Sequence, residues 1–448
     1  MIWTGKQIEA ALFTKVSHQL VTGKIQFNSK DVRKGDLFVA INGGEAYVED
    51  AIEMGAAAVI VAGVTKRHEK VIVVPNALDA LIKLAQYKRN TSKAKFIAIT
   101  GSSGKTSVKE ALQLILGKFG SCFASRGNFN NHLGVPINLA SMPDDAKYGV
   151  FELGMSSANE ISKLTNLVRP HIAVITSIAE AHLQFFNSVL DIVDAKCEIF
   201  QGLNNEGVAI INRDCLYYNY ILKKLTTNVV KNIYTFGESS KAYSRLMSYN
   251  IAKNTKLSYS VNDSVVNFSI PYILPKHQAI NFSACLAVVA SLGLDLTSAS
   301  QSLQSFDPGQ GRGKIIQVQK ANHKFEIICD YYNANPASVK AALNYLKIII
   351  HQKKVIIFGD MLELGTDSQK LHQELSQTII DTSAQKVLLV GEHVKIIAEF
   401  LPKSCYVRLF ANVNDLMSEL SHILEDGELI LIKGSKSIGL NKVMQYFD

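Results

Sequence analysis

The segment Gly101-Ser-Ser-Gly104-Lys105-Thr106-Ser107 carries the most recognisable chemistry of this 448-residue chain. An apolar, β-prone run (residues 96–100) precedes it, and a helix-like run (105 to about 116) follows. Such an arrangement builds a phosphate cradle, because unpaired helix N-terminal amides and the helix dipole attract anions. The glycines let the backbone approach the phosphates, Lys105 would reach the β- and γ-phosphates, and the Thr106 hydroxyl would hold Mg²⁺.

The full P-loop pattern has one more glycine, at the position of Ile99. We therefore predict a shortened loop that binds a nucleotide. The residues predicted to contact it are Gly101, Ser102, Ser103, Gly104, Lys105, Thr106 and Ser107.

Polar residues also follow other expected strands. Glu152 ends the run 148–152, and His182 comes shortly after the run 172–176. Ligands of open α/β sheets bind at the carboxyl ends of the strands, and a carboxylate there could supply an oxygen to Mg²⁺. Taken singly, Glu152 also fits a surface carboxylate and His182 a polar loop residue.

Two further positions are ambiguous by themselves. Lys196 lies in a helical stretch (189–200), where a lysine is ordinarily a solvated surface residue. Asp330 ends another expected strand, with Asn333 and Asn335 close behind it. These polar groups could bind a ligand, or they could form an Asx turn before a helix that starts at Pro336.

Strands and helices alternate along the chain in three regions, which predicts an α/β fold with mainly parallel sheets covered on both faces. We predict a small N-terminal α/β domain (1–84), a central P-loop-type domain (85–309) and a C-terminal dinucleotide-fold-like domain (310–448), with a hinge at 307–312. The C-terminal region has no G-x-G-x-x-G after a strand, so we do not expect it to bind NAD. The strands expected outside the phosphate loop are 36–41, 57–62, 148–152, 172–176, 208–211, 325–330, 355–358, 386–390 and 429–432. The expected helices include 47–54, 78–88, 158–167 and 189–200.

Composition narrows the class of protein. The net charge is +8, but the basic residues are scattered, so nucleic-acid binding is not expected. Six cysteines without a C-x-x-C pair indicate reduced thiols and a cytoplasmic location. There is no signal-like start and no apolar run near the length of a membrane span.

Read together, these segments resemble the Mur ligases, which are ATP-dependent, amide-forming enzymes of peptidoglycan precursor synthesis. The resemblance extends over nearly the whole chain. Two motifs are similar to the branch of the family that adds D-alanyl-D-alanine to UDP-N-acetylmuramoyl-tripeptide: Asp330-Tyr-Tyr-Asn-Ala-Asn-Pro336 and Gly359-Asp-Met-Leu-Glu-Leu-Gly365. The other matching segments are 100–106, 126–131, 134–136, 152–154, 176–182, 195–198, His277 with Asn281, and Gly311-Arg312. One departure is Glu45-Ala46-Tyr47, where the family usually has Asp-Gly-His.

The resemblance implies roles for individual residues. Lys105, Glu152, His182 and Lys196 would be catalytic, and two Mg²⁺ ions would be held by Thr106, Glu152, His182 and a carbamylated Lys196. Asn281, Arg312 and Asp330 would contact ATP. Substrate contacts are expected from Ser29, Asn128, Asn131, Asn333, Asn335 and Glu363.

Two other functions stay open at this point. One is a related ligase such as a folylpolyglutamate synthase, although the Asp-Gly-Ala-His-Asn-Pro motif of that branch is not found. The other is a nucleotide-binding switch without ligase chemistry, which would need neither the Glu152, His182 and Lys196 set nor an amine-binding third domain. The expected partners are small molecules only, and the expected state is a monomer.

Overall fold

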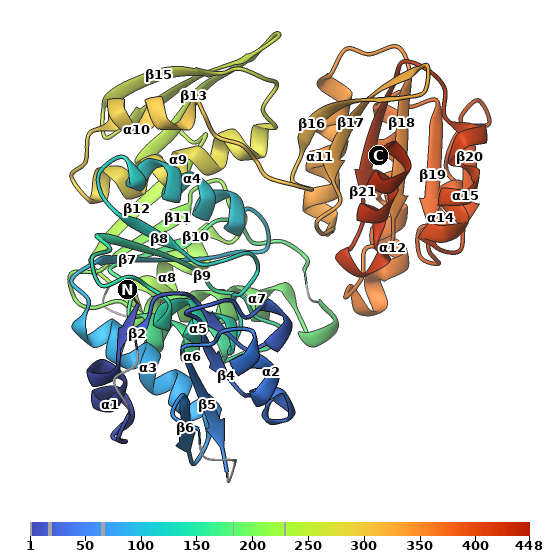
Figure 1. The fold of residues 1–448 in the computed structure, drawn as a ribbon. Helices are drawn as coiled ribbons and strands as arrows, with labels where there is room; N and C mark the ends of the chain where they lie inside the picture. Colours follow the sequence, from blue (N-terminus) through green and yellow to red (C-terminus); the bar gives the residue numbers. More distant parts are fainter. Residues whose placement is uncertain (1, 17–19, 64–67, 182, 228–229) are drawn as a thin grey trace.

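The computed structural model describes residues 2–16, 20–63, 68–181, 183–227 and 230–448. Three main sheets follow one another along the chain, within residues 25–74, 95–270 and 314–433. Figure 1 shows the N-terminal part below the central part and the C-terminal part beside it. The fold is α/β with mostly parallel strands, as predicted. Among the helices of the described ranges, none is long and apolar enough to cross a membrane.

The N-terminal sheet has the order β3-β4-β5-β6, and all neighbouring strands are parallel. The predicted short helix is α2 (Val48–Glu53), and it packs on β5. Before this sheet, β1 (Trp3–Thr4) pairs with β2 (Leu20–Val21), and α1 (Gly5–Leu12) lies between them in the chain. The sheet strands are β3 (Ile25–Gln26), β4 (Leu37–Val39), β5 (Ala58–Ala62) and β6 (Val71–Val74).

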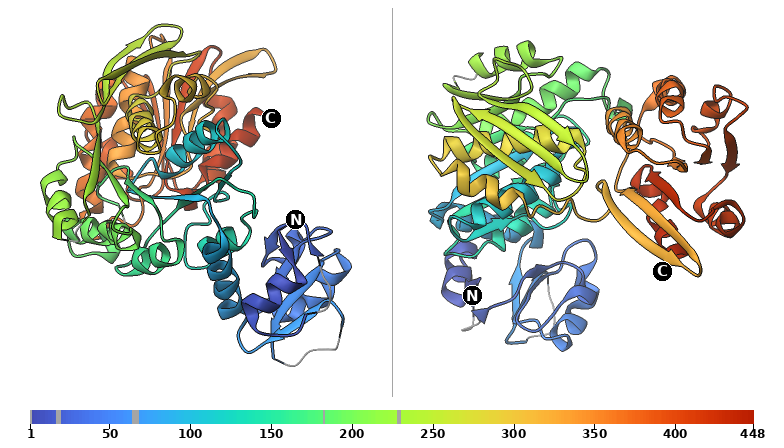
Figure 2. Two further views of the ribbon diagram at one scale, coloured as in Figure 1. Left: turned by 90° about the vertical axis from the view of Figure 1, so that its left-hand side faces the viewer. Right: turned by 90° about the horizontal axis from the view of Figure 1, so that it is seen from above.

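Helix α3 (Ala77–Thr91) joins the N-terminal part to the central part. The buried ammonium of Lys88 pairs with Asp144 and lies 4.6 Å from the ring centroid of Trp3. The Trp3 indole in turn donates to the carbonyl of Ala140 at 2.8 Å. These contacts fix the N-terminal part to the central part. The left view of Figure 2 shows the two parts joined in this region.

The central sheet has nine strands in the order β15-β14-β13-β12-β11-β10-β7-β9-β8. Its middle, from β12 to β8, is parallel throughout. The parallel strands are β7 (Lys95–Thr100), β8 (Cys122–Ala124), β9 (Tyr148–Glu152), β10 (Ile172–Ile175), β11 (Val208–Asn212) and β12 (Asn232–Gly237).

Strand β7 shows why this sheet needs helices on both faces. Phe96 and Ala98 face one hydrophobic cluster, whereas Ile97 and Ile99 face another, and all four are fully buried. The helices of the central part that belong to the first cluster include α5 (Gly134–Ala140), α6 (Glu160–Val168) and α7 (Val189–Cys197). Three cover the second: α4 (Lys105–Gly117), α9 (Lys276–Ser291) and α10 (Leu296–Leu303). Helix α8 (Tyr218–Thr227) also packs on the first cluster.

This sheet has an antiparallel extension that was not predicted from the sequence. Strand β13 (Ser244–Ile251) pairs with β14 (Thr255–Val261), which pairs with β15 (Ser264–Ile270). Asn262 and Asp263 form the turn between β14 and β15 and both have positive φ values, 46° and 67°. Such two-residue turns are typical of tight hairpins. The Asn-Asp pair between two segments of alternating polar and apolar residues was therefore a signal from which the hairpin could have been predicted.

The third sheet has the order β16-β17-β21-β18-β19-β20, and only β16 is antiparallel to its neighbour. Its helices cover both faces, in agreement with the prediction of a dinucleotide-fold-like region. The strands are β16 (Lys314–Lys320), β17 (His323–Asp330), β18 (Lys354–Gly359), β19 (Lys386–Val390), β20 (Tyr406–Phe410) and β21 (Glu428–Lys433). The helices are α11 (Pro336–Ile348), α12 (Ser368–Gln373), α13 (Leu375–Asp381), α14 (Lys395–Ala398), α15 (Val413–Ile423) and α16 (Met444–Phe447).

Helix α11 is one of the elements of the C-terminal part that dock on the central part. The hydroxyl of its buried Tyr345 donates to the carbonyl of Ile273, just before α9, at 2.5 Å. The right-hand view of Figure 2 shows the C-terminal part standing beside the central part, connected by the segment after α10. The two parallel sheets thereby present strand ends to a common space.

Candidate active site

A cavity of about 600 Å³ lies between the central part and the third sheet. The central part contributes the phosphate loop (102–107), the end of β9 and the segment after β10; the third sheet contributes residues after β17 and β21. Cationic side chains outnumber carboxylates on its walls, which suits an anionic ligand. The cationic groups are Lys105, Arg312, Lys433 and Lys436, and the carboxylates are Glu152, Glu160 and Asp330.

The glycines of the loop are required by close packing. Gly101 has φ +150°, and a Cβ there would lie 2.0 Å from the Thr176 hydroxyl oxygen. Gly104 has φ +84°, and its Cβ would lie 2.8 Å from the Asn281 amide nitrogen. No side chain caps the N-terminus of α4 at Gly104. The first amides of this helix are therefore available to an anion.

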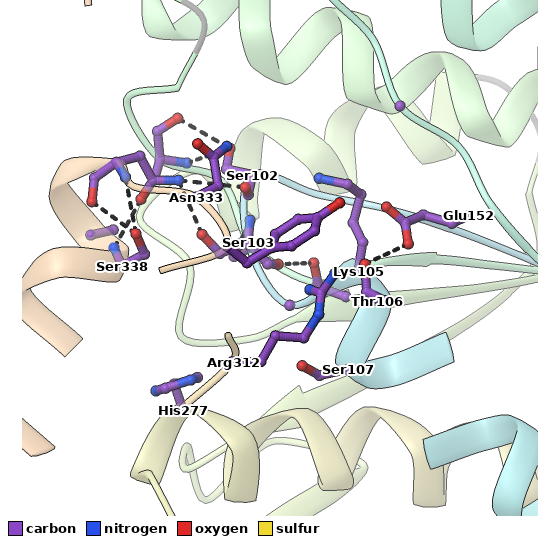
Figure 3. Close-up of a pocket in the computed structure, with 18 of the residues that line it drawn as sticks. Ser102, Ser103, Lys105, Thr106, Ser107, Glu152, His277, Arg312, Asn333 and Ser338 are labelled. Atoms are coloured by element: carbon purple, nitrogen blue, oxygen red, sulfur yellow. Dashed lines mark hydrogen bonds between the residues drawn. The ribbon is translucent and has the colours of Figure 1, made fainter. Parts of the chain in front are cut away.

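Lys105 starts α4 and folds back over the loop, where its ammonium donates to the carbonyl of Gly101 at 2.6 Å. Burial lowers the pKa of this lysine, and the nearby Glu152 carboxylate opposes the shift. Figure 3 shows Lys105, Thr106 and Glu152 side by side at this wall of the cavity.

Glu152 is a buried carboxylate with both oxygens engaged. Oε2 accepts from the Thr106 hydroxyl at 2.7 Å, and Oε1 accepts from the Asn130 amide at 2.8 Å. The side chain is only 3% exposed, so the alternative of a surface carboxylate is wrong. Strand pairing explains the proximity, because Glu152 on β9 is in register with Ile99 on β7. A hydroxyl and a carboxylate form a hard-oxygen donor set of the kind that Mg²⁺ takes.

Lys196, in the last turn of α7, is 2% exposed and lines the cavity. Within the described ranges its ammonium has no hydrogen-bond or ion-pair partner. Burial, and to a smaller extent the nearby Lys105 cation, lowers its pKa well below the usual 10.5. The alternative of a solvated lysine is therefore wrong. A buried, uncharged amine is the form that reacts with CO₂, so the residue fits the implied carbamate.

His182 lies outside the described residues. No group of three or more His, Cys, Asp and Glu side chains that could hold a metal occurs in the part of the chain that the structure describes.

On the opposite wall, Lys433 organises the segment that follows β17. Its ammonium pairs with Asp330 at 3.0 Å and donates to the carbonyl of Asn333 at 2.8 Å. Asn335 caps α11 by accepting from the Ser338 amide at 2.8 Å, as the Asx alternative predicted. The same Asn335 also donates to the Ser103 hydroxyl at 3.1 Å. Figure 3 shows this wall facing the phosphate loop.

The remaining nucleotide candidates also line the cavity. Asn281, on α9, is 8% exposed and lies against Gly104. The backbone carbonyl of Arg312 accepts a hydrogen bond from the side-chain amide of Gln278 at 2.9 Å. The guanidinium carbon of Arg312 lies 3.9 Å from the ring centroid of Tyr332.

The structure does not bring every candidate together. Asn128, Asn131, Asn333 and Asn335 line the cavity, but Ser29 and Glu363 do not. Ser29 is buried in the N-terminal part. Glu363 is exposed, has φ +63°, and its carbonyl accepts from the Gln184 amide at 3.1 Å.

Lys433 and Lys436 were not among the candidates predicted from the sequence, yet both line the cavity. They belong to the segment Lys433-Gly-Ser-Lys436, directly after the apolar run of β21. Polar residues at the end of a buried parallel strand were the signal that selected Asp330, and the same signal could have found these lysines.

Comparison with protein families agrees with this geometry. The Mur ligase middle domain matches residues 99–289, and the Mur ligase glutamate ligase domain matches residues 311–436. The chain belongs to the Mur ligase family. The two matches contain the phosphate loop and the third-sheet wall of the cavity, and residues before 99 lie outside both.

Curated relatives match this Mur ligase over most or all of its length. It is 46% identical to the UDP-N-acetylmuramoyl-tripeptide–D-alanyl-D-alanine ligase of Rickettsia prowazekii (strain Madrid E), with 100% of both chains covered. It is 31% identical to the ligase of the same name from Escherichia coli (strain K12), over 93% of this chain and 92% of the relative.

Solved structures give the same result. MurF from Acinetobacter baumannii superposes with a TM-score of 0.85 at 27% identity, covering 99% of this chain and 98% of the other. The MurF ligase of Thermotoga maritima in complex with ADP gives a TM-score of 0.80 at 26% identity, covering 96% and 98%. The three-domain Mur ligase fold and the family predicted from the sequence are thus confirmed.

Proposed function

We propose that this Mur ligase joins D-alanyl-D-alanine to the peptide of UDP-N-acetylmuramoyl-tripeptide in an ATP-dependent step of peptidoglycan precursor synthesis. The observation that carries the proposal is the 46% identity to the Rickettsia prowazekii ligase over the full length of both chains. The cavity supports it, because one wall is a nucleotide loop and the other presents polar side chains to an incoming amine.

The reaction has two steps. A carboxylate oxygen of the tripeptide attacks the γ-phosphorus of ATP, the bond to the bridging oxygen breaks, and ADP leaves. The amine of the dipeptide then attacks the acyl carbon, phosphate departs, and the nitrogen loses a proton. The first step brings two anions together, so it requires positive charge around the phosphoryl group.

The chain supplies this charge from both walls. Lys105 and the unpaired amides of α4 face the phosphates from the central part, and Arg312 faces them from the hinge. Asn281, beside Gly104, is positioned for the adenine, and Asp330 is positioned for the nucleotide from the third sheet. Asn128, Asn131, Asn333 and Asn335 line the remaining space, where the peptide and the amine would meet.

Thr106, Glu152 and Lys196 are the described residues that would hold Mg²⁺, with His182 expected at a second ion. Lys196 would do so as a carbamate, formed when its neutral amine adds to CO₂ and releases a proton. When bound, Mg²⁺ neutralises charge on the transferring phosphoryl group. The buried oxygens of Thr106 and Glu152, and the lowered pKa of Lys196, support this assignment.

Phosphate release provides the test. We expect turnover only when ATP, UDP-muramoyl tripeptide and D-alanyl-D-alanine are all present, with a product whose mass equals the sum of the two substrates minus water. L-Alanyl-L-alanine and single amino acids are the control amines. Equal turnover with D-glutamate or L-alanine would contradict the assignment, and turnover of a folate with L-glutamate would favour the related ligase.

We further propose that the protein acts as a cytoplasmic monomer. Its six cysteines are all unpaired, in keeping with the reduced thiols predicted from the sequence. Light scattering of the purified chain at micromolar concentration should give a mass near 49.2 kDa, and twice that mass would contradict the monomer.

A further inference from the structure

Arg312 is held by an aromatic ring and not by a carboxylate. Its guanidinium carbon lies 3.9 Å from the centroid of Tyr332. The carboxylates nearest in the chain are engaged elsewhere, since Asp307 pairs with Lys314 and Asp330 with Lys433. Across the ranges that the structure describes, Arg312 forms no ion pair.

Contact with a ring instead of a carboxylate leaves the Arg312 guanidinium able to bind an anionic ligand. A carboxylate would occupy the N–H donors of the guanidinium, whereas a ring face attracts the charge and leaves the in-plane donors available. In Figure 3 the Arg312 side chain extends toward Lys105 and Thr106. The guanidinium thus faces the wall where the phosphates are expected.

The ring and the guanidinium belong to one backbone unit. The amide of Tyr332 donates to the carbonyl of Gly311 at 3.0 Å, and the amide of Gly313 donates to that of Cys329 at 2.7 Å. The hinge segment is thereby tied to the segment after β17 on both sides of Arg312. Gly311 makes this approach possible, because with φ +71° a Cβ would lie 2.9 Å from the ring of Tyr331.

We propose that Tyr332 is a positioning residue that holds the Arg312 guanidinium in place for the nucleotide phosphates before the nucleotide binds. The inference rests on the proposed function, because it takes Arg312 to be a nucleotide contact. The neighbouring Tyr331 has a different task, since its ring packs under Gly311 and among the buried side chains of the third sheet.

Calorimetric titration with ADP in the presence of MgCl₂ tests this without relying on turnover. The variants are Tyr332→Phe, Tyr332→Leu, Arg312→Ala and the double variant Tyr332→Leu/Arg312→Ala. Phenylalanine keeps the ring, so ADP affinity should stay within about twofold of the wild type. Leucine removes the ring face, and affinity should fall by about five- to tenfold.

The double variant decides whether Tyr332 acts through Arg312. If it does, the double variant binds ADP no more weakly than Arg312→Ala alone, because the ring has nothing left to hold. The proposal would be overturned if the losses of ADP affinity in the two single variants multiplied in the double variant. It would also be overturned if Tyr332→Leu bound ADP with wild-type affinity. Kinetics should agree, with the KM for ATP raised more than kcat is lowered in Tyr332→Leu.

Tyr446→Leu is the matched control, because it removes a ring that lies 4.4 Å from the Lys320 ammonium and away from the cavity. It should leave ADP affinity unchanged, and an equal loss in this control would overturn the specific role of Tyr332. A wild-type chain that binds ADP but forms no amide would overturn the proposed function and leave the Tyr332 result standing.

Discussion

The two walls of the cavity are built in different ways. On the central wall, the loop from Gly101 to Ser107 is one continuous segment between a strand and a helix. On the third-sheet wall, Asp330 and its partner Lys433 are 103 residues apart and meet through the pairing of β17 with β21. A motif therefore specifies the phosphate loop of the first wall, whereas strand pairing assembles the second wall.

The walls also differ in what their charged groups are free to do. Lys196 on the central wall is buried without a partner among the described residues, whereas Lys433 on the third-sheet wall pairs with Asp330 and donates to the carbonyl of Asn333. Burial of an ionisable group without a partner costs free energy, and such groups are common at functional sites. We infer that the central wall carries the chemistry and that the third-sheet wall positions ligands against it.

Lys196 should give the largest effect. Replacement by alanine should abolish ligation with little change in unfolding temperature, and arginine should fail as well because it cannot form a carbamate. Small carboxylates such as formate should restore part of the activity of Lys196→Ala, measured as phosphate release. Lys224→Ala is the control, since that lysine is 43% exposed and pairs with Asp194. An active Lys196→Arg enzyme would rule out the carbamate.

Lys105→Ala should follow in size, with kcat lowered by about 10²-fold or more, because a charge facing the transferring phosphoryl group is lost. Steady-state kinetics at saturating ATP would measure it. Lys109→Met is the matched control. It removes a lysine one turn further along α4, and the Lys109 ammonium donates to the carbonyl of Gly127 at 3.2 Å. Near wild-type kcat in a folded Lys105→Ala protein would show that the loop is not catalytic.

Lys433→Met should act on binding more than on chemistry. It leaves Asp330 unpaired and frees the segment after β17, so KM values should rise by about tenfold and stability should fall by about 2–3 kcal/mol. Lys386→Met removes a similar ion pair of the same sheet, with the buried Glu428 at 2.8 Å, but outside the cavity. Lys386→Met should lower stability and leave the KM values unchanged. If both variants had the same kinetics, the third-sheet wall would have no positioning role.

Tyr345→Phe should give the smallest effect, because it removes one hydrogen bond between α11 and the central part. We expect a loss of about 1 kcal/mol in unfolding free energy and little change in kcat/KM. Tyr259→Phe provides a comparison within the central part, where the hydroxyl donates to Ala279 at 2.8 Å. A tenfold loss of activity in Tyr345→Phe alone would show that docking of α11 limits the reaction.

Local sequence pattern was sufficient for much of the fold. Apolar runs predicted most of the parallel strands, although β3, β6, β8, β12 and β20 were not predicted. The glycine loop followed by Lys105 predicted the start of α4. The hairpins from β13 to β15 were missed, because their alternating polar and apolar residues give a weaker signal than the apolar runs of buried parallel strands. Lys433 and Lys436 were missed although they follow the apolar run of β21, and the pairing of β21 with β17 shows that they line the same cavity as Asp330.

The sequence by itself determined the residue types at the strand ends and the glycines that allow close approach to a phosphate, because both follow from neighbouring positions. The tertiary structure decided what those residues can do. Lys196 is an ordinary helical lysine until folding buries it beside Lys105, where the energetic cost of an unpaired charge lowers its pKa. Likewise Ser103 and Asn335 are 232 residues apart, and only the docking of α11 brings their side chains within 3.1 Å.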